Sequence, residues 1–107
     1  MIDLSEDLME QVINILEQYI PDAEVWAFGS RVRGTAKKHS DLDLVVVGKQ
    51  KIAQKTYYQL QEAFQESELP IRVDILDWHR ITSEFQQNIK KQYAVIKKVN
   101  ASDKRLV

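Results

Sequence analysis

Residues 27–44, AFGSRVRGTAKKHSDLDL, restrict the fold of this chain more than any other stretch. An apolar run ends at a Gly-Ser pair, ten mostly polar and basic residues follow, and two aspartates separated by one leucine begin a second apolar run. The β-forming residues 24–28 before Gly29 predict a strand that stops in a turn. The run 42–47, LDLVVV, is apolar at both parities after Asp43, which predicts a strand covered on both faces.

Helices and strands alternate in the rest of the chain. The patterns predict helices from residue 4 to before Pro21, a short turn after residue 30, helices over 51–68 and from Thr82 or Ser83, and strands over 71–76 and 93–96. Asp3 and Glu6 are expected to form the capping box of the first helix. The candidate core positions of the later helices are Ile52, Leu60, Ala63, Phe64, Phe85 and Ile89. This alternation predicts an α/β fold with helices packed on a small sheet.

Length and composition set the remaining bounds. A chain of 107 residues predicts a single domain, over residues 1–100, with a frayed tail over 101–107. A net charge of -1, with 44% apolar and 29% charged residues, is typical of a globular protein and does not favour direct nucleic-acid binding. The absence of cysteine excludes disulfides and thiolate metal sites, and the acidic N-terminus without a long apolar run predicts a cytoplasmic location.

Asp41 and Asp43 are the first candidate site residues. Residues i and i+2 of a strand point to the same face, so these two carboxylates are expected about 6–7 Å apart along one edge of the sheet. Two ionised carboxylates this close repel each other unless a cation lies between them. Mg²⁺ is the natural candidate, because it binds one or two carboxylates together with water and substrate phosphates.

The residues after the first strand are candidates for binding those phosphates. Gly29 lets the backbone approach a phosphate closely, and the hydroxyl of Ser30 supplies a donor beside the exposed amides of a turn. Arg31 and Arg33 are expected to neutralise phosphate oxygens. Lys37 and Lys38 fit a solvated basic loop instead.

A third carboxylate is expected if two metal ions are bound. Asp74 lies within the predicted strand IRVDIL with apolar neighbours on the opposite parity, and it is the preferred third ligand. Asp77 is the alternative, although its odd offset from Asp74 places it on the other face of a regular strand. His39 and His79 are isolated, and neither is expected to bind zinc or act as a base.

The string GSRVRGTAKKHSDLDL resembles the nucleotidyltransferase signature of the DNA polymerase beta superfamily, and in particular its minimal nucleotidyltransferase (MNT) branch. The resemblance implies a palm-like fold with a mixed sheet of three to four strands flanked by helices. It also implies that Ser30 binds the triphosphate and that Asp41, Asp43 and Asp74 bind two Mg²⁺ ions. No nucleophilic side chain of the enzyme is then required, because the acceptor hydroxyl attacks the α-phosphorus directly.

The resemblance further implies a biological role. The MNT branch is similar to the antitoxin half of two-gene modules whose toxin is a helical HEPN-domain ribonuclease, and some members adenylylate a tyrosine of that toxin. The expected activity is therefore transfer of AMP from ATP to a HEPN partner, in a hetero-oligomer with that partner. Two alternatives stay open: a non-catalytic antitoxin that neutralises its partner by binding, and transfer to a small molecule such as an aminoglycoside.

Overall fold

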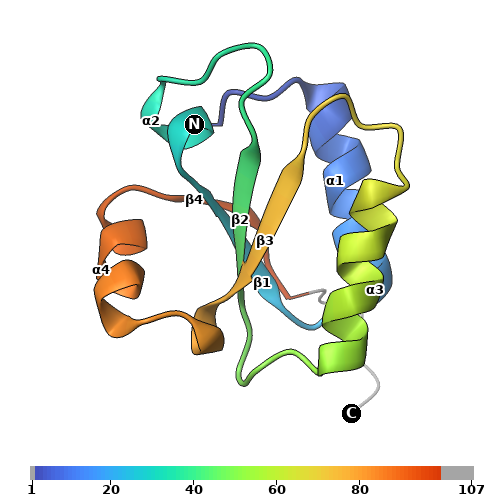
Figure 1. Ribbon diagram of the computed structural model, residues 1–107, viewed down its shortest axis with the longest axis vertical. Helices are drawn as coiled ribbons and strands as arrows, with labels where there is room; N and C mark the ends of the chain where they lie inside the picture. The colour runs from blue at the N-terminus through green and yellow to red at the C-terminus, as the bar shows by residue number, and fades with distance from the viewer. Residues whose placement is uncertain (1, 100–107) are drawn as a thin grey trace.

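The computed structural model describes residues 2–99 as a four-stranded sheet with helices on both sides (Figure 1). The elements in chain order are α1 (Glu6–Tyr19), β1 (Glu24–Phe28), α2 (Ser30–Arg33), β2 (Leu42–Val47), α3 (Gln54–Gln65), β3 (Val73–Asp77), the 3-10 turn η1 (Trp78–Arg80), α4 (Ser83–Lys91) and β4 (Ala94–Lys97). The predicted α/β class is therefore confirmed. The tail expected over 101–107 lies outside the described residues.

The sheet is mixed, with the strand order β3-β2-β1-β4. β1 pairs antiparallel with both β2 and β4, whereas β2 and β3 run parallel. The two central strands have the predicted bounds, 24–28 and 42–47. Because β2 lies between an antiparallel and a parallel neighbour, residue Asp43 has Phe28 beside it on one side and Asp74 on the other.

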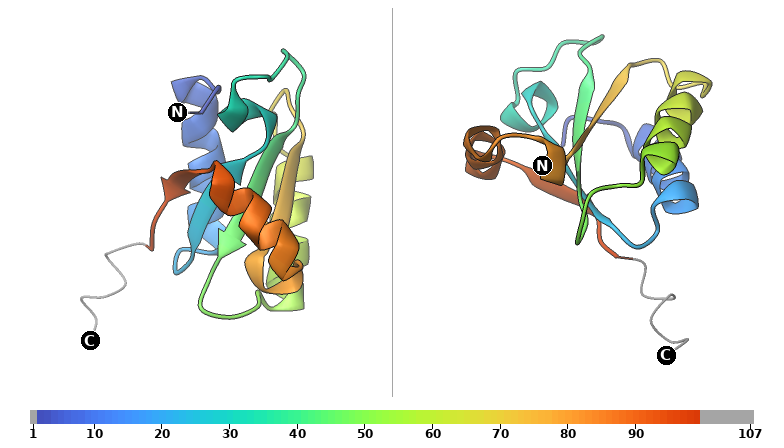
Figure 2. Two further views of the ribbon diagram at one scale, coloured as in Figure 1. Left: turned by 90° about the vertical axis from the view of Figure 1, so that its left-hand side faces the viewer. Right: turned by 60° about the horizontal axis from the view of Figure 1, so that its bottom comes forward.

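Helices α1 and α3 pack on one face of the sheet, and α2 and α4 lie on the other side of it (Figure 2). The apolar core lies under α1 and α3, where alternate residues of β1 and β2 meet Val12, Leu16, Leu60 and Phe64. Val45 points away from this core and is nevertheless fully buried. Strand β2 is therefore covered on both faces around Val45, as its continuous apolar sequence predicts.

The ends of several helices differ from the sequence prediction. The cap of α1 is Ser5, whose hydroxyl accepts a hydrogen bond from Leu8 N at 3.2 Å, so the predicted capping box of Asp3 and Glu6 is wrong. The backbone of Asp3 is used elsewhere, since its amide donates to the carbonyl of Arg31 at 2.7 Å. Helix α3 begins at Gln54, three residues later than predicted, because Ile52 is buried in the core as part of the preceding loop.

None of the helices between residues 2 and 99 is long and apolar enough to cross a lipid bilayer.

Candidate active site

Asp43 and Asp74 lie on the sheet face opposite to the core, which is the open face of the sheet. Their neighbours Leu42, Leu44 and Ile75 are buried in that core, and side chains alternate between faces along a strand. Asp43 and Asp74 are register partners in the parallel pair β2–β3, so their backbones are roughly 4.8 Å apart. Asp41 precedes the first residue of β2 and joins the same end of the sheet.

Gly29, which follows the last residue of β1, lies beside these acidic residues. Its φ of 82° and ψ of -156° belong to a backbone region that essentially only glycine adopts. A β-carbon at this position would lie 3.2 Å from Asp43 Cγ and would overlap Asp43 Oδ2. Two independent constraints therefore require glycine at this position: the turn into α2 needs its backbone conformation, and the carboxylate of Asp43 occupies the space that a side chain would fill.

The three carboxylates influence each other electrostatically. Burial raises the pKa of Asp43 above its ordinary value of 3.8, and the nearby charges of Asp74 and Asp41 raise it further. The guanidinium of Arg33 acts in the opposite direction and lowers the same pKa. A cation that bound between the acids would relieve this repulsion.

The turn from β1 into α2 carries the predicted phosphate-binding residues. Ser30 is the first residue of α2, and its hydroxyl makes no hydrogen bond to another residue in the part of the chain that the structure describes. Arg33 is exposed and close enough to Asp43 to affect its pKa. Ser30 and Arg33 therefore present a free hydroxyl and a cation at the same end of the sheet as the acids.

Arg31 points away from this surface. Its side chain is buried, with 7% of the residue exposed, and its guanidinium donates to the backbone carbonyls of Asp3, Lys38 and Ser40. The sequence predicts Arg31 as a phosphate ligand, because an arginine after Gly-Ser has the right charge. The structure does not bring its guanidinium to the surface that carries the acids.

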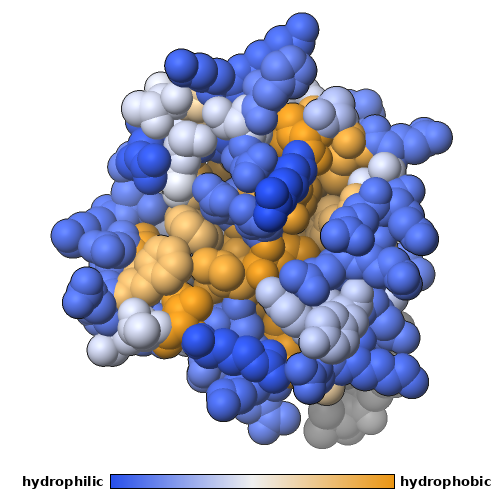
Figure 3. Space-filling model, viewed as in Figure 1, coloured by the Kyte–Doolittle hydropathy of each residue, from blue (hydrophilic) through white to orange (hydrophobic). Residues whose placement is uncertain are grey.

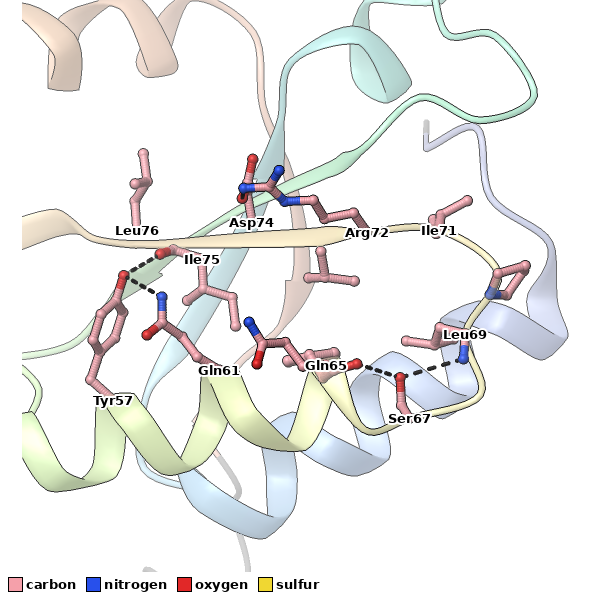
Figure 4. A pocket seen from close by; sticks show the side chains of 13 residues that line it. Tyr57, Gln61, Gln65, Ser67, Leu69, Ile71, Arg72, Asp74, Ile75 and Leu76 are labelled. Carbon is pink, nitrogen blue, oxygen red and sulfur yellow. Dashed lines mark hydrogen bonds and ion pairs between the residues drawn. The ribbon is translucent and has the colours of Figure 1, made fainter.

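Arg72 is a residue of this site that the sequence argument missed. Its guanidinium forms an ion pair with Asp74 Oδ1 at 3.1 Å, on the open face of β3 (Figure 4). Both side chains remain substantially exposed, at 74% for Arg72 and 43% for Asp74. The sequence indicates this residue through the i, i+2 spacing of Arg72 and Asp74, which places the arginine on the same strand face as the third acid.

A pocket of about 530 Å³ runs beside Asp74 along the outer edge of β3, between this strand and α3 (Figure 4). β3 is an edge strand, so its outward backbone groups have no neighbouring strand. The hydroxyl of Tyr57 donates to Ile75 O at 2.7 Å and satisfies one of these groups. Burial raises the pKa of Tyr57, which keeps this hydroxyl protonated as a donor.

Asp77, the alternative third acid, lies on the opposite side of the strand. It is 3% exposed, and its carboxylate accepts hydrogen bonds from Ile52 N, His79 N and Arg80 Nη1 at 2.8, 3.0 and 2.8 Å. These contacts tie the loop before α3 to the end of β3. The odd offset from Asp74 correctly predicts that Asp77 does not share its face.

Aromatic side chains border the acids on the open face. Phe28, the register partner of Asp43, packs edge-on against Phe85 of α4 with ring centroids 6.0 Å apart. Trp26 stacks on Tyr93 at 4.1 Å and meets Trp78 edge-on at 5.2 Å. In the space-filling view, apolar surface crosses the middle of this face and hydrophilic side chains surround it (Figure 3). The open face therefore combines an anionic end with an apolar, aromatic middle.

The donor set fits a divalent cation, although the side chains are not gathered around one point. Within residues 2–99, no three acidic, histidine or cysteine side chains converge closely enough to form a finished metal site. Asp41, Asp43 and Asp74 nevertheless supply the carboxylate oxygens that Mg²⁺ prefers: Asp43 and Asp74 share one face, and the charges of Asp41 and Asp74 both act on Asp43. Asp74 is also paired with the exposed guanidinium of Arg72, a positive charge that would compete with such a cation.

Comparison with known proteins identifies the family of this chain. The family described as "Polymerase beta, Nucleotidyltransferase" matches residues 10–102. The chain is also 46% identical over 95 residues to the "Probable protein adenylyltransferase MntA" of Haemophilus influenzae, which covers 89% of this chain and 83% of that protein.

Solved structures share the fold. A toxin-antitoxin with AMP-PNP superimposes with a TM-score of 0.71 at 23% identity, over 90% of this chain and 77% of that one. An MNT antitoxin in complex with the tri-AMPylated HEPN toxin of Shewanella oneidensis gives 0.67 at 19% identity, over 94% and 78%. A minimal nucleotidyltransferase gives 0.61 at 28% identity, over 79% and 85%. These likenesses concern the fold, whereas the family match over residues 10–102 and the 46% identical relative show that the chain is a nucleotidyltransferase and belongs to the polymerase beta family.

Proposed function

We propose that this nucleotidyltransferase transfers AMP from ATP to a tyrosine hydroxyl of a HEPN-domain toxin, and thereby acts as the antitoxin of that partner. The observation that carries the proposal is the placement of Asp43 between Gly29 and Asp74, with Ser30 and Asp41 at the same end of the sheet. The relative from Haemophilus influenzae is named a protein adenylyltransferase, which supports a protein as acceptor.

The residues of the open face take separate roles in this proposal. Asp41, Asp43 and Asp74 would hold two Mg²⁺ ions, which would supply charge neutralisation for the triphosphate and for the leaving pyrophosphate. Gly29 leaves room beside Asp43, the Ser30 hydroxyl donates to a phosphate oxygen, and Arg33 adds a positive charge. The absence of a side-chain partner for the Ser30 hydroxyl among residues 2–99 leaves it available for this contact.

The transfer itself needs one bond made and one bond broken. The acceptor oxygen bonds to the α-phosphorus of ATP while the bond from that phosphorus to the bridging oxygen breaks, and pyrophosphate leaves. The hydroxyl proton passes to a carboxylate of the acidic set.

The open face gives a reason for a macromolecular acceptor. Helices α2 and α4 border the acids without enclosing them, and the aromatic side chains of Phe85 and Tyr93 are partly exposed beside them. A small acceptor would find few enclosing walls here, whereas a protein surface can cover the acids and the apolar middle together. A HEPN toxin accompanies the MNT antitoxin in the solved structure from Shewanella oneidensis, which supports that class of partner.

The experiment is intact-mass spectrometry of a HEPN-domain toxin after incubation with the chain, Mg²⁺ and ATP. A gain of one or more AMP units that is absent with Asp43→Asn supports the proposal. Omission of Mg²⁺, and replacement of ATP by other nucleoside triphosphates, test the cofactor and the nucleotide in the same assay.

The alternative of inhibition by binding alone predicts a different result. The HEPN protein would then form a complex with the chain and lose its ribonuclease activity without any gain in mass. The Asp43→Asn variant would neutralise the toxin as well as the unmodified chain does. This result would overturn adenylylation as the mechanism.

A further inference from the structure

The guanidinium of Arg31 connects three segments of backbone. Nη1 donates to Asp3 O at 2.8 Å, Nε and Nη2 donate to Ser40 O at 3.1 and 2.9 Å, and Nη2 also reaches Lys38 O at 3.3 Å. The connection to the N-terminal segment is reciprocal, because Asp3 N donates to Arg31 O at 2.7 Å. In the described part of the chain, no carboxylate pairs with this buried cation, so its contacts are all with backbone carbonyls.

The loop that Arg31 holds ends at the first acid. Residues 37–40 form a turn in which Ser40 N donates to Lys37 O at 3.0 Å and Lys37 N donates to Ser40 Oγ at 2.8 Å. Asp41 follows Ser40, and the amide of the next residue, Leu42, donates to Arg72 O at 2.9 Å. The backbone of Asp41 is therefore fixed on one side by Arg31 through Ser40 and on the other side by the sheet.

Arg31 also follows Ser30 directly, within the same four-residue turn α2. A contact with phosphate would require this guanidinium to give up its four hydrogen bonds to carbonyl groups and to leave a buried position. Arg33, two residues later, is exposed and already acts on Asp43 electrostatically. The two arginines of the motif therefore have different surroundings, and only the second faces the acids.

We infer that Arg31 is a positioning residue: its guanidinium holds the 37–40 turn against α2 and the N-terminal segment, and so fixes Asp41 relative to Ser30 for binding of the divalent cation. The inference rests on the proposed function only in assuming that Asp41 is a metal ligand. It replaces the phosphate-binding role that the sequence predicts for Arg31.

The test measures metal binding rather than transfer. Mn²⁺ is titrated into the nucleotide-free chain and followed by electron paramagnetic resonance, for the unmodified protein, Arg31→Lys and the matched control Arg80→Lys, whose guanidinium pairs with Asp77 outside the candidate site. Both substitutions keep the positive charge, but a lysine presents its N–H donors from a single nitrogen, whereas the Arg31 guanidinium reaches Asp3 O and Ser40 O from separate nitrogens. We expect Arg31→Lys to weaken Mn²⁺ binding about 10-fold or more, the range for residues that orient metal ligands, and Arg80→Lys to change it less than about 2-fold.

A second variant keeps the inference testable if Arg31→Lys does not fold. Ser40→Ala removes the hydroxyl that accepts from Lys37 N, which loosens the same exposed turn while Arg31 remains in place. We expect weaker Mn²⁺ binding by a few-fold, together with faster hydrogen exchange of the amides of residues 37–42 and an unchanged exchange in β1.

Two results would overturn the inference. If Arg31→Lys reduces affinity for a non-hydrolysable ATP analogue in the absence of metal while Mn²⁺ binding is unchanged, Arg31 is a phosphate ligand. If Arg31→Lys lowers the melting temperature, but Mn²⁺ binding measured well below that temperature is unchanged in Arg31→Lys and in Ser40→Ala, the role of Arg31 is structural only. Because neither readout uses the transfer reaction, failure of the adenylylation proposal would be seen separately by intact-mass spectrometry.

Discussion

The α-carbon of Gly29 packs against the carboxylate of Asp43, and no side chain fits between them. The first residue of the Gly-Ser pair and the second aspartate of the signature are fourteen positions apart in the sequence, yet they share one small space in the structure. This contact explains in physical terms why the two parts of the motif occur together.

Gly29→Ala is expected to reduce transfer at least about 100-fold, because the new methyl group displaces the carboxylate of Asp43 from its position. The matched control is Gly34→Ala. Gly34 also has a positive φ, 81°, but a β-carbon there meets nothing within 4 Å. The control is expected to lower stability by about 1–2 kcal/mol and to retain activity at temperatures where it is folded. Equal losses of activity in both variants, each assayed while folded, would contradict the proposed contact.

Asp43→Asn is expected to raise the melting temperature in EDTA, by up to ~4 °C. The folded state raises the pKa of Asp43 above 3.8, so the folded chain binds more protons than the unfolded chain between 3.8 and the raised value. The stability that protonated Asp43 contributes at low pH is therefore lost as the pH rises from 3.8 through the raised pKa. Thermal melts at pH 7.5 and at decreasing pH should show that the advantage of the variant shrinks toward pH 4. A lower melting temperature at pH 7.5 would contradict this prediction.

Arg72→Gln is expected to strengthen Mn²⁺ binding about 2–5-fold at low ionic strength, because Asp74 is then free of its competing cation. The effect should shrink in 0.5 M salt, which screens an exposed ion pair. Arg72→Lys keeps the charge and serves as the control. If Arg72→Gln and the unmodified chain bind Mn²⁺ with equal affinity at low salt, the ion pair does not compete with the metal.

Asp74→Asn and Asp77→Asn should separate the two neighbouring acids. Asp77→Asn is expected to lower stability by about 2–3 kcal/mol, since its buried carboxylate accepts from two backbone amides and from Arg80. A fall of about 10 °C or more in melting temperature would follow for a chain of this size. Asp74→Asn should leave the melting temperature nearly unchanged and abolish transfer. The opposite pattern would mean that Asp77 is the third acid of the site.

The parts of the fold that the sequence predicted best are those in which local pattern and tertiary packing agree. Strands 24–28 and 42–47 were predicted to the residue, because β-forming runs end at glycine and both strands are central in the sheet. The strand order was not predictable, since it depends on long-range pairing that periodicity does not encode. The cap of α1 was misjudged because Asp3 and Ser5 are both good capping residues, and the contact of Asp3 N with Arg31 O decides between them.

The candidate site was predictable in residue type and spacing but not in the direction of side chains. Asp43 and Asp74 follow from the two-residue period of a strand, and so does the exclusion of Asp77 from their face. Arg31 and Arg33 look alike in the sequence, and only the loop that folds back over Arg31 separates them. Arg72 was missed because its role depends on a single contact with Asp74.

The sheet has full helical cover on one side, whereas α2 and α4 only border its acidic side (Figure 2). The active site therefore lies on an uncovered face of the sheet. Under the proposed function, the surface of the acceptor protein covers that face. Water would then be excluded from the triphosphate only while the acceptor is docked. Hydrolysis of ATP by water should consequently decrease when the toxin docks, and the toxin would both accept AMP and cover the site of the enzyme that silences it.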